Sequence, residues 1–145
     1  MQLPSIVTKA PLVLRCALVF ISLLVSAASL AQENNSKVYE LRVYHTNEGK
    51  LEALQTRFRE HTHAIFTRLG MKVIAYWTPI SQPEASSTLI YIIEHDSEED
   101  AKQKWQKFFN DPEWQAAYQA SIKNGKLVKG VDVTFMQATD YSPAL

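Results

Sequence analysis

Apolar and polar side chains alternate most regularly in residues 38–44, which read Val-Tyr-Glu-Leu-Arg-Val-Tyr. A β-strand sends successive side chains to opposite faces of its sheet, so this pattern predicts a strand with two different faces. The apolar face consists of Tyr39, Leu41 and Val43, and the polar face consists of Glu40, Arg42 and Tyr44. We expect the apolar face to pack against helices and the polar face to point away from them.

Helical periodicity is strongest in residues 50–69. The apolar positions there fall within one arc of about 60° when residues are placed at helical steps, which predicts an amphipathic helix. These positions are Leu51, Leu54, Phe58, Ile65 and Leu69. A second helical region, 97–122, restarts at Asp111-Pro112, because aspartate is a good N-cap and proline suits the first helical position. Its aromatic residues are interpreted as core contacts: Trp105, Phe108, Phe109, Trp114 and Tyr118.

Three further strands are predicted at 71–78, 88–95 and 131–137 from their β-branched and aromatic residues. The resulting order is β-α-β-β-α-β, the α+β ferredoxin-like arrangement, with both helices on one face of a four-stranded antiparallel sheet. Residues 89–93 are apolar on both faces, whereas an antiparallel strand with one wet face would alternate. We therefore expect a second copy of the chain to cover the free sheet face, giving a homodimeric barrel.

The start of the chain is typical of an export signal. Lys9 and Arg15 precede an uncharged apolar run over 16–28, and small residues suited to a signal peptidase follow at 29–31. The run is short for a membrane-spanning helix, which needs about 20 residues; an uncleaved anchor is the alternative. The predicted organisation is a signal peptide over 1–31, a linker over 32–36 and one domain over 37–145, exported to the periplasm or secreted.

Composition narrows the function classes. The single cysteine, Cys16, lies in the predicted signal, so the domain has to be stable without disulfides. Removing Lys9 and Arg15 from the 15 basic residues leaves 13 against 15 acidic ones, a net charge of about −2. Because no long basic run remains, we expect no nucleic-acid partner, and no membrane partner after signal cleavage. The chain has no glycine-rich phosphate loop, cysteine-based zinc motif or nucleophile elbow, so no metal and no cofactor is predicted.

The polar face of residues 38–44 is the candidate site, provided that the barrel interior encloses it. Arg42 would clamp an anion or a carbonyl group, Tyr44 would donate a hydrogen bond, and Glu40 would help to orient the ligand. The alternative is a purely structural pair of Glu40 and Arg42, since buried charges have to be paired. The sequence leaves both interpretations open.

An aromatic side chain of the second strand is a candidate for the wall of this site. Strand alternation places Trp77 on one face with Val73 and Ala75, and Tyr76 on the other. One of the two rings must then look away from the helices and can line a pocket. Core packing is the alternative for Trp77.

The third strand offers Tyr91 and His95, which share a face. A phenol and an imidazole near a strand end can complete a binding wall or perform acid–base work. A surface position at the strand terminus is the alternative for His95. No residue is assigned as catalytic.

Several of these residues together resemble one protein family. The strand 38–44, followed by Gly49-Lys50, Trp77 and Asp111-Pro112-Glu113-Trp114, is similar to the NIPSNAP family over nearly all of the domain. The resemblance implies a dimeric α+β barrel, which agrees with the fold predicted above. That superfamily includes cofactor-independent monooxygenases and isomerases, whereas NIPSNAP domains have no settled reaction.

The leading hypothesis is an exported NIPSNAP-like homodimer that binds a small, largely apolar molecule. The predicted ligand-binding residues are Glu40, Arg42, Tyr44, Trp77, Tyr91 and His95. The first alternative is a cofactor-independent monooxygenase or isomerase on the same scaffold. The second is a protein-interaction module whose barrel is filled by its own side chains. Fold analogy alone does not choose among them.

Overall fold

The computed structural model describes residues 37–143, so the predicted signal peptide and linker lie outside the described residues. In chain order the elements are β1 (Val38–Thr46), α1 (Leu51–Arg57), the π-helical segment η2 (Phe58–Thr62), α2 (His63–Arg68), β2 (Lys72–Trp77), the 3-10 turn η3 (Glu84–Ser86), β3 (Thr88–His95), α3 (Glu98–Phe109), α4 (Pro112–Ser121) and β4 (Val128–Gln137). The predicted element order is confirmed. The first helix is divided by η2, and the last strand begins at Val128 rather than at 131.

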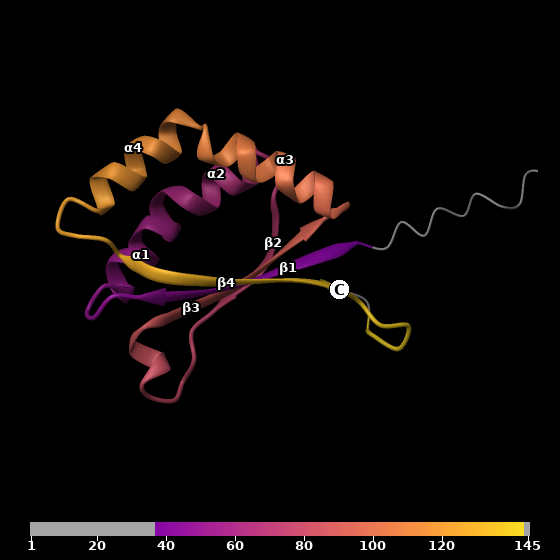
Figure 1. Ribbon diagram of the computed structural model, residues 1–145, viewed down its shortest axis with the longest axis horizontal. Coiled ribbons are helices and arrows are strands. Elements are labelled where there is room, and N and C mark those ends of the chain that lie inside the picture. The colour runs from indigo at the N-terminus through magenta and orange to yellow at the C-terminus, as the bar shows by residue number, and fades with distance from the viewer. Residues whose placement is uncertain (1–36, 144–145) are drawn as a thin grey trace, which may run out of the picture. The chain divides into compact units, whose positions relative to one another are not determined.

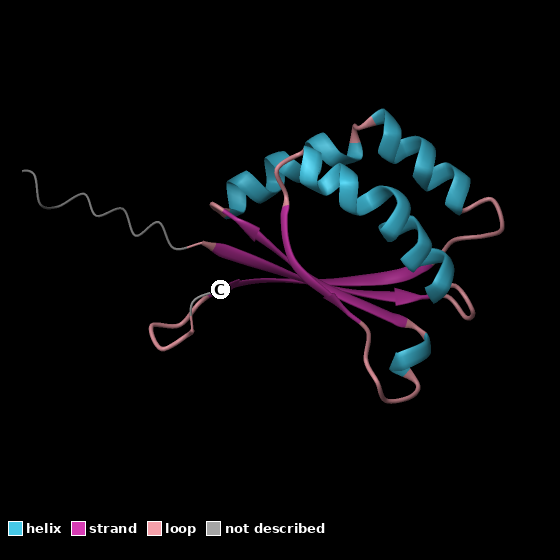
Figure 2. Cartoon of the chain, turned by 180° about the vertical axis from the view of Figure 1, so that it is seen from behind, coloured by secondary structure: helices cyan, strands magenta, loops and turns pink. Residues whose placement is uncertain are grey.

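The four strands form one antiparallel sheet in the order β2-β3-β1-β4. Helices α1 to α4 cover one face of this sheet, and the other face is open (Figure 1, Figure 2). The strands β1 and β3 occupy the centre, whereas β2 and β4 form the edges. This arrangement confirms the predicted ferredoxin-like α+β fold.

Aromatic rings fill the layer between the sheet and the helices. Tyr91 of β3 is fully buried at its centre, and four rings surround it at centroid distances of 5.3 to 6.1 Å. These rings belong to Tyr44, Phe58, Phe66 and Tyr76. Tilted and edge-to-face pairs of this kind stabilise a core beyond the area that they bury.

The predicted orientation of β1 is wrong. Glu40 pairs across the sheet with Ile93, and Arg42 pairs with Tyr91. Because Ile93 and Tyr91 are fully buried beneath the helices, the polar face of β1 also points at the helices. The partly exposed side chains on the open face of this strand are Tyr39, Leu41 and Val43.

The polar face can be buried because its side chains find partners there. The Glu40 carboxylate accepts hydrogen bonds from Arg42, His95 and Trp105, and the Tyr44 ring packs edge-on against Phe58 at 5.9 Å. Assigning strand faces by hydrophobicity alone overlooks hydrogen-bond partners of this kind. The predicted enclosure of the polar face is therefore supplied by this chain's own helices rather than by a second copy.

A bulge in β2 changes the predicted faces of that strand. Val73 pairs with Ile93 and Ala75 pairs with Ile92, so one extra residue separates the two pairs. Val73 therefore packs on the helix side with Tyr76, whereas Trp77 points to the other side. The prediction that Val73 and Trp77 share a face is wrong, because a bulge breaks the period of two.

Capping side chains fix the start of α3 and α4, as predicted. The Ser97 hydroxyl accepts from the Asp100 backbone N–H at 3.1 Å. The Asp111 carboxylate accepts from the N–H groups of Glu113 and Trp114, both at 3.1 Å. These bonds satisfy donors that a helix start leaves free, and they fix the direction in which α4 crosses the sheet.

Within residues 37–143, no helix is long and apolar enough to cross a membrane.

Candidate functional site

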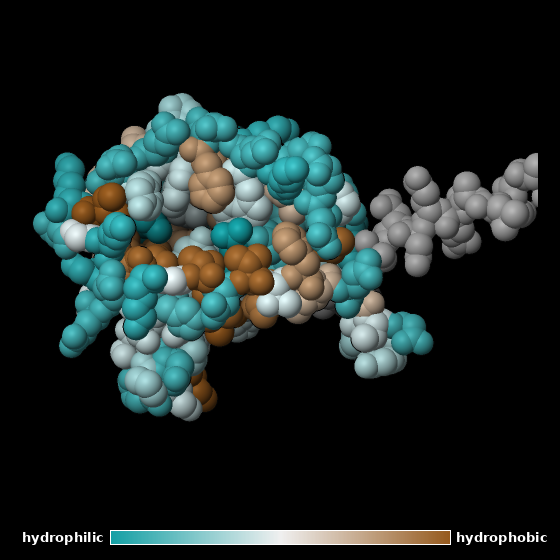
Figure 3. Space-filling view, viewed as in Figure 1, coloured by the Kyte–Doolittle hydropathy of each residue, from teal (hydrophilic) through white to brown (hydrophobic). Residues whose placement is uncertain are grey.

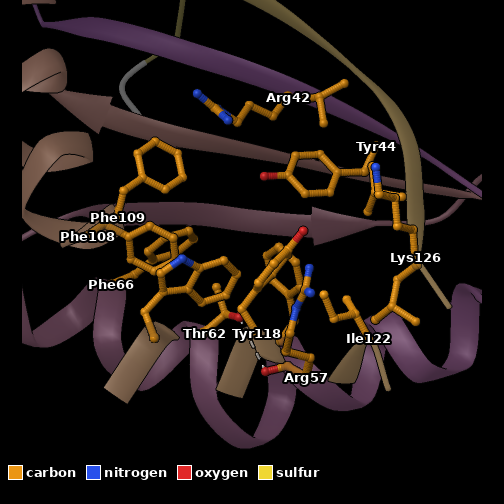
Figure 4. A pocket seen from close by; sticks show the side chains of 15 residues that line it. Arg42, Tyr44, Arg57, Thr62, Phe66, Phe108, Phe109, Tyr118, Ile122 and Lys126 are labelled. Atoms are coloured by element: carbon orange, nitrogen blue, oxygen red, sulfur yellow. Dashed lines mark hydrogen bonds between the residues drawn. The ribbon is translucent and has the colours of Figure 1, made fainter. Parts of the chain in front are cut away.

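A cavity of about 250 Å³ lies between the sheet and the helix layer (Figure 4). Strand β1 supplies Arg42 and Tyr44, the helical segments supply most of the rings, and the chain after α4 supplies Lys126. Seven aromatic rings and three basic side chains line the cavity, and none of its lining residues is a carboxylate. Such a wall favours an apolar molecule that carries few polar groups.

The π-helical segment η2 shapes one wall of this cavity. A π turn holds more residues per turn than an α turn, so Arg57, Phe58 and Thr62 all reach the cavity. The Thr62 hydroxyl donates to the Arg57 carbonyl at 3.3 Å, which closes the widened turn with a side chain. Segments of this kind occur frequently at functional sites.

A hydrogen-bonded cluster around Glu40 holds one end of the cavity. The Glu40 carboxylate accepts from Arg42 Nε at 2.7 Å, from Trp105 Nε1 at 2.7 Å and from His95 Nε2 at 2.9 Å. Because a carboxylate only accepts, His95 carries a proton on Nε2. The Arg42 guanidinium also lies over the Trp105 ring, 3.7 Å from its centre. Glu40 thus anchors Arg42 while remaining outside the cavity lining.

The cluster favours the charged form of Glu40. Burial alone would raise the pKa of this carboxyl group. The hydrogen bonds from His95 and Trp105 and the positive charge of Arg42 outweigh burial, so the pKa lies below its ordinary value. Glu40 and Arg42 therefore form a neutralised pair.

Arg57 lies at the other end of the cavity in a different environment. Only 5% of this residue is exposed. Its Nη1 donates to the Ser121 hydroxyl at 3.0 Å, and its Nε has no acceptor among the described residues. Trp114 and Tyr118 flank the guanidinium at 5.0 and 5.4 Å from their ring centres. No carboxylate of residues 37–143 forms an ion pair with it.

Burial lowers the pKa of Arg57, and only phenols act against that effect. The groups that oppose the lowering are Tyr44, Tyr118 and Tyr91, and none of them is a carboxylate. An arginine nevertheless stays protonated in proteins. The cavity therefore contains a buried positive charge that nothing in the described part of the chain neutralises.

The mouth of the cavity lies beside β4. Helices do not cover this edge strand, so its apolar side chains on the helix side remain exposed, namely Val131, Val133 and Phe135. Figure 3 shows the surface hollowed between the helix layer and this apolar row. Lys126 is exposed near the same opening.

The structure brings five of the predicted site residues onto the helix-facing side of the sheet. Arg42 and Tyr44 line the cavity. Glu40, His95 and Tyr91 are buried next to these two residues but are not part of the cavity lining. The alternative of a surface position for His95 is wrong, because this residue is 1% exposed.

Trp77 lies apart from the cavity, and 45% of it is exposed. Trp77 therefore does not line this cavity. The β2 bulge, which sequence periodicity does not reveal, accounts for its position.

Sequence reasoning missed Arg57 and Lys126 as site residues. It assigned Trp114 and Tyr118 to the core; Trp114 does pack against the core, and both rings also line the cavity. Arg57 is buried beside Ser121 where α4 packs against α1, whereas Arg59 is exposed, and no local pattern encodes that packing. No group of His, Cys, Asp or Glu within 37–143 is arranged to hold a metal ion.

Comparison with known proteins places this architecture in a family. The NIPSNAP family model matches residues 39–143. The chain belongs to the NIPSNAP family. No curated protein matches the sequence.

Solved structures, among them NIPSNAP proteins, share the fold. A NIPSNAP-like domain protein from Burkholderia xenovorans has 18% identity and a TM-score of 0.66, over 77% of this chain and 92% of that one. A NIPSNAP family protein from Agrobacterium tumefaciens has 24% identity and a TM-score of 0.64, over 74% and 90%. A dimeric protein of unknown function with a ferredoxin-like fold from Bacteroides fragilis has 14% identity and a TM-score of 0.50, over 70% and 96%. At these identities the similarity establishes the NIPSNAP fold and not a ligand.

Proposed function

We propose that this NIPSNAP domain binds a small, largely apolar molecule in the cavity between its sheet and its helices. The observation that carries the proposal is an aromatic wall interrupted by a few aimed polar groups, Arg42, Tyr44 and Arg57. Cavities with that composition are typical of small-molecule sites. An open cavity also favours this function over an interaction module whose interior is filled.

The geometry favours binding over acid–base catalysis. Glu40 is fully engaged by three donors and has a lowered pKa, which makes it a weak proton acceptor. Burial raises the pKa of the Tyr91 phenol well above its ordinary range, so Tyr91 stays neutral. A cofactor-independent oxygenase or isomerase remains the alternative on this scaffold.

The proposal includes a homodimer formed through the open sheet face. Partly exposed apolar side chains cover that face, namely Tyr39, Leu41, Val43, Ile90 and Ile92. Burying such an apolar surface stabilises the protein, and a second copy of the chain is the simplest partner that could bury it. The dimeric state of the Bacteroides fragilis protein is consistent with this arrangement. The site itself lies within one subunit.

The proposal also includes export, which rests on the charged start, apolar run and small residues of the first 31 positions. Cleavage after Ala31 would leave a mature chain starting at Gln32. Intact mass measurement of the protein recovered from the periplasm or the medium reports that start directly. A mass that includes residues 1–31 would contradict cleavage.

A cavity-filling substitution tests the binding function. Ile122→Trp places a large ring in the cavity wall, whereas Gln119→Trp places the same ring on the exposed side of α4. With benzyl alcohol as a neutral probe, saturation-transfer NMR should show binding to the wild type and to Gln119→Trp. Binding to Ile122→Trp should be lost, because the volume is occupied.

Equal binding of the probe by all three proteins would mean that the molecule binds elsewhere. Absence of binding by the folded wild type to neutral and acidic aromatic probes alike would overturn the proposed function. Native mass spectrometry of the same samples reports the number of subunits. A monomer at micromolar concentration would overturn the homodimer.

A further inference from the structure

Resting on the proposed function, we propose that the ligand of this cavity is a small aromatic carboxylic acid, bound as its anion by Arg57. The inference names the chemical class of the ligand and assigns its counter-ion. Neither follows from the family, because the solved relatives are of low identity and carry the fold alone.

The three basic side chains that line the cavity differ in their partners. Of the three basic side chains in its wall, Arg42 is already paired with Glu40 at 2.7 Å. Lys126 is exposed, so water can solvate it. Arg57 is the buried member, and the described residues offer it a neutral hydroxyl and two ring faces. A buried charge without a counter-ion is unfavourable, so an anion entering the cavity would gain a strong partner.

The geometry of Arg57 suits a carboxylate. A guanidinium presents parallel N–H donors that match the two oxygens of a carboxylate. Ser121 occupies Nη1, whereas the Nε donor has no acceptor in the part of the chain described. Figure 4 shows the Arg57 side chain reaching into the cavity among the lining rings. The Nε atom is itself covered by neighbouring side chains, so a carboxylate can bind at this edge without displacing Ser121 once those side chains move aside.

The size and lining of the cavity suit an aromatic carboxylate. An apolar cavity of about 150 Å³ holds one benzene ring, and this cavity measures about 250 Å³. The additional volume suits a carboxylate on a short chain. Across the cavity from Arg57, Phe66, Phe108 and Phe109 supply faces for a ring (Figure 4). One buried cation matches one negative charge, so a monocarboxylate fits better than a phosphate.

Matched probes and variants test the inference. The probes are 3-phenylpropionate and its neutral amide, 3-phenylpropanamide, measured by isothermal titration calorimetry on the full purified protein. We expect wild-type protein to bind the acid with 1:1 stoichiometry and at least about tenfold more tightly than the amide, because a charge-assisted pair is lost in the amide. Arg57→Met should weaken binding of the acid by at least about tenfold and leave the amide nearly unchanged. Arg59→Met, which changes an exposed arginine of the adjoining segment η2, should bind both probes like the wild type.

A second variant keeps the test decisive if Arg57→Met does not fold. Ser121→Asp supplies an internal carboxylate beside Arg57 Nη1. It should weaken binding of 3-phenylpropionate, because the charge that recruits the acid is then already neutralised. Equal affinity of the wild type for acid and amide, or an unchanged acid affinity in both variants, would overturn the carboxylate assignment. Retained binding of the amide in that case would leave the proposed apolar binding function standing.

Discussion

Arg42 and Arg57 line the same cavity but differ in their partners. Arg42 donates to Glu40 at 2.7 Å and lies 3.7 Å above the Trp105 ring, within a cluster that His95 completes. Arg57 is more deeply buried and has only the Ser121 hydroxyl as a hydrogen-bond acceptor among the described residues. A charge whose partners are all supplied by the fold contributes to the architecture. A charge without a partner costs stability and is therefore a candidate for function.

Breaking the cluster at Glu40 should have the largest effect on stability. Glu40→Leu leaves the partly buried Arg42 charge and the donors of His95 and Trp105 without an acceptor. We expect the free energy of unfolding to fall by about 3–5 kcal/mol, measured by urea titration. Glu52→Leu, whose exposed carboxylate lies 3.8 Å from Arg59, should change it by less than about 0.5 kcal/mol. A loss below about 1 kcal/mol for Glu40→Leu would mean that the cluster is not structural.

Removing the charge at Arg57 should change the stability less than Glu40→Leu does, and in the opposite direction. Arg57→Met replaces an unneutralised buried cation by an apolar chain of similar length. We expect the ligand-free protein to gain about 1 kcal/mol of stability, seen as a higher midpoint in thermal unfolding. A loss of more than about 1 kcal/mol would mean that Arg57 stabilises the fold as Arg42 does, and the proposed difference between the two arginines would be wrong.

The smallest effect should appear as a pH dependence. The folded-state pKa of Glu40 lies below its unfolded value, so its contribution to stability is complete above about pH 4.3, the ordinary value for glutamate. That contribution is lost as the pH falls through the lower folded pKa. Protonation keeps an oxygen acceptor in place, so the loss should be smaller than in Glu40→Leu. The difference in unfolding free energy between wild type and Glu40→Leu, measured from pH 6 to pH 3, should shrink; a constant difference would contradict the assigned shift.

The features of the fold that depend on neighbouring residues could be predicted from the sequence. The order of elements, the caps at Ser97 and Asp111 and the strand at 38–44 all depend on neighbouring residues, and the structure confirms them. The polar residues of that strand were predicted to face a barrel interior closed by a second copy, whereas the helices of the same chain enclose them. The face was misassigned because the partners of Glu40 lie 55 and 65 positions along the chain, at His95 and Trp105.

The missed part of the site depends on packing between distant segments. Arg57 becomes buried because Ser121, 64 positions away, and the rings of α4 close over it. Nothing near Arg57 in the sequence distinguishes it from Arg59. Trp77 was misplaced for a related reason, since the bulge between Val73 and Ala75 belongs to the pairing of two strands and not to one.

The π-helical segment η2 sets the rotation of α1 about the helix axis relative to α2. A π turn advances each residue by less than the about 100° of an α-helix, so winding the same five residues of η2 as an α-helix would rotate α1 relative to α2 by about the angle of one residue. With Ile65 and Phe66 held in the core, such a rotation would swing the Arg57 guanidinium out of its place beside Ser121. The winding of this single turn thus determines whether Arg57 is placed in the cavity as a buried cation, independently of which residues line the rest of the cavity.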